Sequence, residues 1–245
     1  MIVHKLLKRG LNHPNFCEDF ILDEKLNQEY SLFGVFDGCS SGVDSHLAST
    51  LIAKIIRAEA NKINIEKLSF DEILEKITFK TLKSLKKISK KFFLSKNELL
   101  STIILFLYNQ NSDKGKIISI GDGFLSINKH EIEINQNNQP NYLAYNIDEI
   151  RNKKEFKIWY DENVGKYDVE NLEDVTISTD GIFSFANDYN SENYNNKEIN
   201  IIEYLTQDKN LFSNKAMLGR KYNILKKTHF LQNFDDLGII RIIKQ

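Results

Sequence analysis

This chain combines a set of short, apolar, strand-like stretches with two long amphipathic helices, and few folds accommodate both. Several of these stretches, such as 32–36 and 103–108, are apolar at consecutive positions, which is typical of strands covered on both faces. Short turns separate most of the predicted strands, which favours hairpins and antiparallel sheets. The helices must then cover these sheets. We therefore predict an α+β fold, a four-layer α-β-β-α sandwich of two mainly antiparallel sheets flanked by helices.

The two helices are predicted over about 44–61 and 70–92, where apolar residues recur at helical spacing. The first has a capping pattern at Ser41 and Asp44, and the second has a capping box at Ser69 and Glu72. One face of the second helix carries five lysines: Lys83, Lys86, Lys87, Lys90 and Lys91. Such a face fits a solvated helix surface or a basic membrane-binding helix, and we favour the solvated surface.

Strands are predicted for much of the remaining chain. The segments 102–108, 116–120, 124–128 and 131–134 have the pattern of a meander, and 155–160, 175–178 and 237–243 also have strand character. A further helix is predicted over about 213–228, and the Asn-rich tract 188–200 is expected to be a surface loop. Because the chain contains no internal repeat and no flexible linker, we expect residues 1–245 to form a single domain.

Charge and cysteine usage narrow the class of protein. The net charge of −1, from 33 basic and 34 acidic residues, gives no overall attraction to nucleic acid. Cys17 and Cys39 form neither a disulfide framework nor a zinc-binding spacing, which favours a reducing compartment. The N-terminus has no apolar run typical of a secretory signal, and no stretch is long enough to span a bilayer. We therefore expect a cytoplasmic protein without nucleic-acid or membrane partners, and the sequence predicts no oligomeric state.

Three acidic signatures lie beside predicted strands: Asp37-Gly38, Asp180-Gly181 and Asp235-Asp236. Asp-Gly is also a common turn dipeptide, so either Asp-Gly pair alone would indicate only a loop. Carboxylates at three distant strand ends, however, suit a hard cation, because Mg²⁺ and Mn²⁺ prefer oxygen ligands. The combination predicts a metal site.

Six short motifs extend this pattern. In chain order they are Cys17-Glu18-Asp19, Phe33 to Gly38, Ser101-Thr102, Ile120-Gly121-Asp122, Ser178 to Gly181, and Asp235 to Ile240. In this order and spacing they resemble the type 2C metal-dependent protein serine/threonine phosphatases, in particular the bacterial type. The resemblance covers the chain from about residue 5 to residue 243. It implies the same α-β-β-α sandwich.

The resemblance also implies two bound Mg²⁺ or Mn²⁺ ions and assigns roles by position. The implied metal ligands are Glu18, Asp19, Asp37, Gly38, Asp122, Asp180 and Asp235. Asp37 would bridge the two ions, and Asp37 and Asp180 would be the catalytic residues. Glu18 or Asp19 matches an N-terminal acidic position, and the sequence leaves open which of them serves the metals. Asp122 matches an acid linked to a third, weaker metal.

The activity implied by the resemblance is hydrolysis of phosphoserine or phosphothreonine in proteins, as in signalling. Two cations would lower the pKa of a bridging water, so that hydroxide attacks the phosphoryl group, and would neutralise the phosphate charge. The substrate would be a phosphorylated protein. Two alternatives stay open: a non-catalytic pseudophosphatase that binds a partner or phosphosite, and a small-phosphoester hydrolase of the same fold.

The sequence departs from the family pattern at three positions. Cys39 occupies the place of a His that some members have after the Asp-Gly pair, and Pro14 occupies the place of a phosphate-binding Arg. His13 or Arg9 could supply the missing cation, so His13 is a candidate phosphate-binding residue. Asp236 replaces an Asn of the family pattern, which leaves Asp235 as the better ligand.

Three further side chains near these motifs have alternative roles. Trp159 and Tyr160 lie in the segment 141–165, which corresponds to the family's variable flap, and could contact a substrate or pack in the core. His46 is expected to pack or face solvent rather than act in catalysis.

Overall fold

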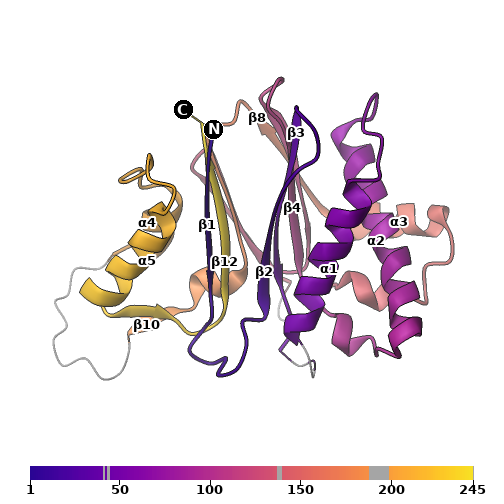
Figure 1. Cartoon of the computed structure of the whole chain (residues 1–245), viewed down its shortest axis with the longest axis horizontal. Helices are drawn as coiled ribbons and strands as arrows, with labels where there is room; N and C mark the ends of the chain where they lie inside the picture. Colours follow the sequence, from indigo (N-terminus) through magenta and orange to yellow (C-terminus); the bar gives the residue numbers. More distant parts are fainter. Residues whose placement is uncertain (41, 43–44, 137–139, 188–198, 245) are drawn as a thin grey trace.

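Two antiparallel sheets packed face to face, with helices on both outer sides, form this molecule (Figure 1). The computed structural model describes all residues except 41, 43–44, 137–139, 188–198 and 245. The predicted four-layer α-β-β-α sandwich is confirmed. Every strand pairing in the described part of the chain is antiparallel.

The first sheet has the strand order β1-β12-β9-β6-β7. Its strands are β1 (Ile2–Lys8), β12 (Leu237–Ile243), β9 (Asp174–Ser178), β6 (Gly123–Ile127) and β7 (His130–Ile134). The second sheet has the order β2-β3-β4-β5-β8. Its strands are β2 (Asp19–Lys25), β3 (Tyr30–Asp37), β4 (Ile103–Asn109), β5 (Lys114–Ile120) and β8 (Gly165–Glu170). A separate pair joins β10 (Phe185–Asn187) to β11 (Leu231–Asn233).

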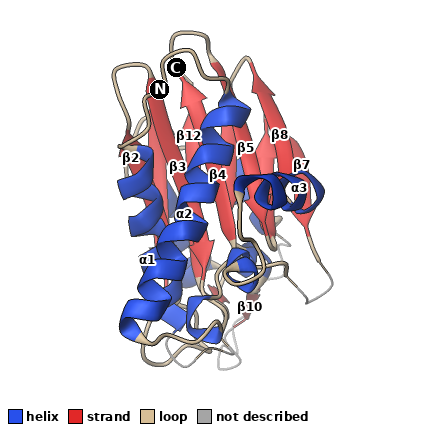
Figure 2. Cartoon of the chain, turned by 90° about the vertical axis from the view of Figure 1, so that its right-hand side faces the viewer, coloured by secondary structure: helices blue, strands red, loops and turns tan. Residues whose placement is uncertain are grey.

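The helices lie on opposite sides of the two sheets (Figures 1 and 2). The second sheet is covered by α1 (Ser45–Ala60), α2 (Phe70–Phe92) and α3 (Lys153–Asn163). The first sheet is covered by α4 (Ile201–Thr206) and α5 (Met217–Thr228). Short 3-10 helices are η1 (Asn97–Leu99), η2 (Leu143–Asn146) and η3 (Asp180–Phe183). None of the helices within the described residues is both long and apolar enough to cross a membrane.

Apolar residues form three buried layers that match this arrangement. Between the sheets, Phe33 and Val35 of β3 pack with Ile177 of β9 and Ile240 of β12. The neighbouring residues on β3, such as Phe36, point to the helical side. Consecutive apolar residues are therefore required, because both faces of the central strands are covered.

The start of α2 is fixed by the predicted capping box. The Ser69 side chain accepts from the Glu72 backbone N–H, and the Glu72 carboxylate accepts from the Ser69 N–H. The Ser41 and Asp44 capping pattern and most of the Asn-rich tract lie outside the described residues. The predicted helix over 213–228 begins only at Met217, and α4 and β8 were not predicted.

The predicted strand over 155–160 is wrong, because this segment belongs to helix α3. Phe156, Ile158 and Tyr160 alternate as in a strand, but Phe156 and Tyr160 are also one helical turn apart and are buried together. Ile158 is left 52% exposed. Asn152 caps the helix by accepting from the Glu155 N–H.

The predicted meander over 102–134 is also wrong in its connectivity. β4 pairs with β5 in the second sheet, whereas β6 pairs with β7 in the first sheet. The segment 121–123 therefore crosses from one sheet to the other rather than closing a hairpin. Gly121 has a positive φ of 87°, which suits such a sharp change of direction. This crossing brings Asp122 to one end of the sandwich.

Candidate metal centre

Four acidic side chains come together where strands of both sheets end. Asp19 begins β2 and lies opposite Asp37, the last residue of β3. Asp180 follows β9 at the start of η3, and Asp235 lies two residues before β12. The arrangement follows from topology, because antiparallel neighbours place the start of one strand beside the end of the next.

A single hydroxyl connects the two sheets at this point. Thr179 Oγ1 donates to Asp19 Oδ2 at 2.7 Å and accepts from the Gly238 N–H at 2.9 Å. The Gly38 N–H donates to the Glu18 carbonyl at 3.1 Å, which continues the pairing of β2 with β3 past Asp37. The Thr179 hydroxyl and this backbone hydrogen bond therefore fix the positions of Asp19 and Asp37.

Loss of solvation and neighbouring charges raise the pKa values of three of these acids. The pKa values of Asp19, which is buried, and Asp37, which is partly buried, lie well above the usual range, first because the charged form of each is poorly solvated. For Asp37 the charges of Asp19, Asp180 and Asp235 raise the pKa further. Burial, followed by the charges of Asp235 and Asp122, raises the pKa of Asp180 to about 6. Such a cluster favours either bound protons or a bound cation.

A cavity of about 310 Å³ adjoins this cluster. It is lined by Asp122, Asp180 and Asp235 together with Glu133, Phe183 and others. Glu133 was not predicted as a site residue; it lies on β7, which pairs with β6 next to Asp122. The sequence around Glu133 gave no motif that would have revealed it.

His13 lies among three carboxylates. Its Nδ1 is 2.8 Å from Asp236 Oδ2, and its Nε2 is 3.7 Å from Asp235 Oδ1 and 3.9 Å from Glu18 Oε2. Burial lowers the pKa of His13, but the contact with Asp236 and the charges of Glu18 and Asp235 outweigh it, so the pKa is raised. Arg9 instead donates to the Pro14 carbonyl at 2.6 Å, within its own loop.

Asp236 holds the N-terminal loop against β12. Its carboxylate is buried and accepts hydrogen bonds from the backbone N–H groups of Gly10 and Glu18. The Asp235 side chain, by contrast, is 49% exposed. Asp235 is therefore the more accessible of the two carboxylates.

The two cysteines flank the cluster without forming a disulfide. Burial, and then the charges of Asp236 and Asp19, raise the pKa of Cys17 to about 12, so its thiol stays protonated. Cys39 hydrogen-bonds with Tyr142, and burial together with this contact raises the pKa of the Tyr142 hydroxyl. Tyr142 was not singled out from the sequence, because it is distant in the chain and carries no motif.

Trp159, Tyr160 and His46 all pack against neighbouring side chains. Tyr160 is fully buried against Phe156, at 5.5 Å between ring centroids, and Trp159 packs on the same core. His46 stacks on Phe16 with 4.3 Å between ring centroids.

The donor chemistry fits hard divalent cations. The clustered groups are carboxylates, and Glu18 Oε2 is buried without a hydrogen-bond partner among the described residues. As they stand, no three His, Cys, Asp or Glu side chains of the described chain converge closely enough to hold an ion. The charges of Asp180 and Asp235 nevertheless act on both Asp19 and Asp37.

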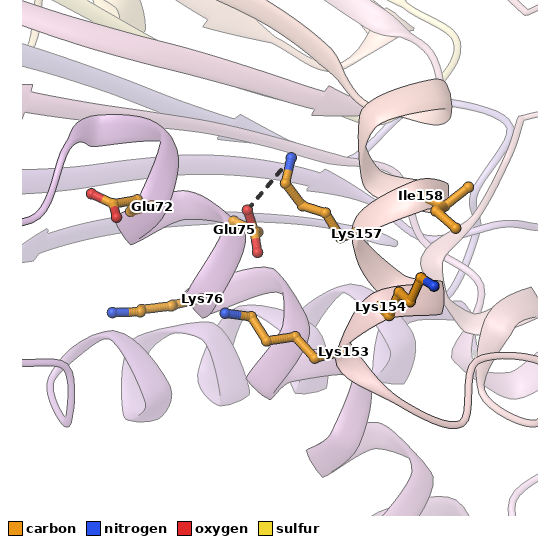
Figure 3. A pocket seen from close by; sticks show the side chains of 7 residues that line it. All are labelled: Glu72, Glu75, Lys76, Lys153, Lys154, Lys157 and Ile158. Carbon is orange, nitrogen blue, oxygen red and sulfur yellow. Dashed lines mark ion pairs between the residues drawn. The ribbon is translucent and has the colours of Figure 1, made fainter.

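A larger cavity, of about 630 Å³, lies elsewhere, between α2 and α3 (Figure 3). It is lined by four lysines, Lys76, Lys153, Lys154 and Lys157. Glu72, Glu75 and Ile158 complete the lining. Lys157 Nζ lies 3.8 Å from Glu75 Oε2. None of the predicted site residues lines this cavity.

The sequence matches the family model of protein phosphatase 2C over residues 10–217. The chain therefore belongs to the protein phosphatase 2C family. No curated protein matches the sequence.

Solved structures of similar fold come from bacterial phosphatases. A bacterial serine phosphatase that carries an arginine-to-glutamate mutation has a TM-score of 0.69 at 12% identity, covering 100% of this chain and 99% of that one. The serine/threonine phosphatase Stp1 from Staphylococcus aureus has a TM-score of 0.61 at 10% identity, covering 100% and 96%. RsbX in complex with magnesium has a TM-score of 0.51 at 15% identity, covering 98% and 92%. At these identities the likeness concerns the fold.

Proposed function

We propose that this protein hydrolyses phosphoserine or phosphothreonine in phosphorylated proteins, with two Mg²⁺ or Mn²⁺ ions, as one catalytic unit over residues 1–245. The observation that carries the proposal is the clustering of Asp19, Asp37, Asp180 and Asp235, in which neighbouring charges raise the pKa values of the first three. Burying several carboxylates together is costly unless a cation compensates them. Membership of a protein phosphatase family supports the same function.

The metal ligands would be Asp37, the Gly38 carbonyl, Asp180 and Asp235, with Glu18 or Asp19 at the N-terminal position and Asp122 at a third site. When bound, the cations would supply an activated water and neutralise the phosphate charge. Magnesium in the RsbX structure is consistent with this choice of ion. Asp19 is already engaged by Thr179, whereas Glu18 has a buried oxygen that makes no hydrogen bond within the described part of the chain, which favours Glu18.

The chain's own residues would orient the reactants. His13 lies beside Asp235 and Glu18, and we propose that its protonated form binds a substrate phosphate oxygen, in the absence of an Arg at position 14. Asp236 holds the His13 ring from its other nitrogen. Cys39 is engaged by Tyr142, so neither group is proposed as the acid that protonates the leaving alcohol.

Hydrolysis of p-nitrophenyl phosphate and of a phosphothreonine peptide tests the proposal. Both should require Mn²⁺ and stop with EDTA. Asp37→Asn and Asp180→Asn should each lower the rate at least ~10²-fold, because each removes a proposed ligand. Asp23→Asn, an exposed acid on β2 that pairs with Lys5, is the matched control and should keep full activity.

Three outcomes would change the proposal. A folded protein without turnover in any divalent metal would favour a pseudophosphatase. Turnover of p-nitrophenyl phosphate without turnover of phosphopeptides would favour a small-phosphoester hydrolase. Full activity in both Asp variants would remove the assigned site.

A further inference from the structure

The C-terminal end of α2 carries an unusual combination of charge and exposed aromatic rings. Residues 83–93 contain five lysines and no acid: Lys83, Lys86, Lys87, Lys90 and Lys91. None of these lysines forms an ion pair among the described residues. Phe92 and Phe93 follow directly and are 61% and 92% exposed. We call residues 83–93 the basic tip.

Core packing does not explain why a phenylalanine occupies position 93. Its ring is almost wholly in solvent, where a bulky apolar side chain gains nothing from burial. Its backbone has a φ of 56°, in the left-handed region that Gly or Asn adopts far more readily at this position of a helix end. If stability were the only requirement, the exposed ring and the left-handed backbone would both favour a residue other than phenylalanine at position 93.

Hydrogen bonds and packing hold the basic tip in place. The Phe93 and Leu94 N–H groups both donate to the Ser89 carbonyl, and Ser89 Oγ donates to the Leu94 carbonyl at 2.9 Å. Ile88 and Leu94 pack against the core on either side of the turn. Lys91 Nζ lies 5.5 Å from the centre of the Phe92 ring, so charge and ring are presented together.

From these features we propose that the basic tip docks the protein on an anionic lipid bilayer surface. Lysines next to a bilayer are attracted to acidic headgroups, and exposed aromatic rings enter the interfacial layer. The rings project from a helix end and line neither the lysine-rich cavity nor the carboxylate cavity, which suits a bilayer better than a peptide ligand. This departs from our expectation that the protein has no membrane partner.

Docking at the tip would bring the candidate metal centre close to the membrane. Only residues 94–100 separate the tip from Ser101, which bridges to Gly38. The Thr102 N–H in turn donates to the Asp37 carbonyl. Phosphoproteins held at the membrane would then be the accessible substrates. This consequence rests on the proposed function, whereas the docking itself does not rest on it.

Co-sedimentation of the full chain with vesicles tests the docking. The protein should bind vesicles of phosphatidylcholine with phosphatidylglycerol, should not bind phosphatidylcholine alone, and should be released by high salt. Phe93→Asn should weaken binding at least about tenfold without loss of stability, because Asn accepts the left-handed backbone. The double variant Lys90→Glu, Lys91→Glu should abolish binding.

The matched control is the double variant Lys226→Glu, Lys227→Glu, which changes two exposed lysines in the last turn of α5. It should bind as the wild type does. Hydrolysis of p-nitrophenyl phosphate without vesicles should be unchanged in all these variants, so failure of docking is distinct from failure of the proposed function. The proposal is overturned by absent binding to anionic vesicles at low salt, by unchanged binding of Phe93→Asn, or by binding to polyglutamate but not to vesicles.

Discussion

Thr179 joins the two sheets through one buried hydroxyl, which is bonded to Asp19 and Gly238. Thr179→Val keeps the shape of the side chain but leaves a buried carboxylate and a buried N–H without this partner. We expect the free energy of unfolding to fall by about 1–3 kcal/mol in urea denaturation. Thr179→Ser retains the hydroxyl and should lose less. Equal losses in the two variants would contradict a role for the hydrogen bonds.

Asp180 gives the metal-free protein a specific pH dependence. Its pKa rises from the usual 3.8 to about 6 on folding, so the folded state binds more protons between these values. Stability should therefore fall as pH rises from about 4 to about 6, and the raised pKa of His13 acts in the same direction at higher pH. Calorimetry in EDTA should show the melting temperature fall over this range. Asp180→Asn should flatten the curve, and parallel curves would contradict the assignment.

Single residues of the candidate site differ in how far the sequence predicts them. Asp37 and Asp180 can be predicted because each lies directly after an apolar strand, within a short motif. Tyr142 and Glu133 cannot, because only the folded chain brings them beside Cys39 and Asp122. The buried role of Asp236 likewise depends on a loop more than 200 residues away, at Gly10 and Glu18.

Gly181 and Gly219 have different surroundings, so one substitution tests packing between elements and the other tests helix propensity. A Cβ at Gly181, in η3, would overlap the Asp236 carbonyl just before β12, whereas a Cβ at Gly219, in α5, meets nothing within 4 Å. Gly219→Ala should therefore raise the free energy of unfolding by about 0.5–1 kcal/mol. Gly181→Ala should lower it and weaken Mn²⁺ binding in calorimetric titration. A Gly181→Ala variant that binds Mn²⁺ as the wild type does would show that η3 need not pack against Asp236.

At the level of elements, the sequence predicts best where periodicity and caps agree. α2 has both, and its start at Phe70 is as predicted. α3 was mistaken for a strand because Phe156, Ile158 and Tyr160 alternate, although burial follows the helical turn. β8 was missed because it is an edge strand with only Val169 buried, so its pattern is weak.

For the whole molecule, Arg241 ties the first sheet to the helices outside it. The fully buried guanidinium bonds both oxygens of Asp174 and the carbonyls of Leu205 and Asp208. Arg241→Met leaves Asp174 as an unpaired buried charge and should cost about 3–5 kcal/mol in the free energy of unfolding. Replacing both partners, with Arg241→Met and Asp174→Leu, should recover part of that loss. Greater instability in the double variant would contradict this account.

The layered architecture as a whole was predictable, but the exchange of strands between the sheets was not. Consecutive apolar strands and amphipathic helices require four layers. The crossing at 121–123 has the residues of an ordinary tight turn, so local chemistry predicts a hairpin there. Only the pairing of β6 with β9 shows that the chain changes sheets.

The proposed function requires acids from separate strands to hold a pair of divalent cations at one end of the sandwich. Anomalous diffraction from crystals grown with Mn²⁺ would locate such cations. We predict two neighbouring Mn²⁺ peaks in contact with Asp37, with Asp180 and Asp235 among the ligands. Ordered crystals with no Mn²⁺ peak beside Asp37, or with Mn²⁺ bound only elsewhere, would contradict the proposal.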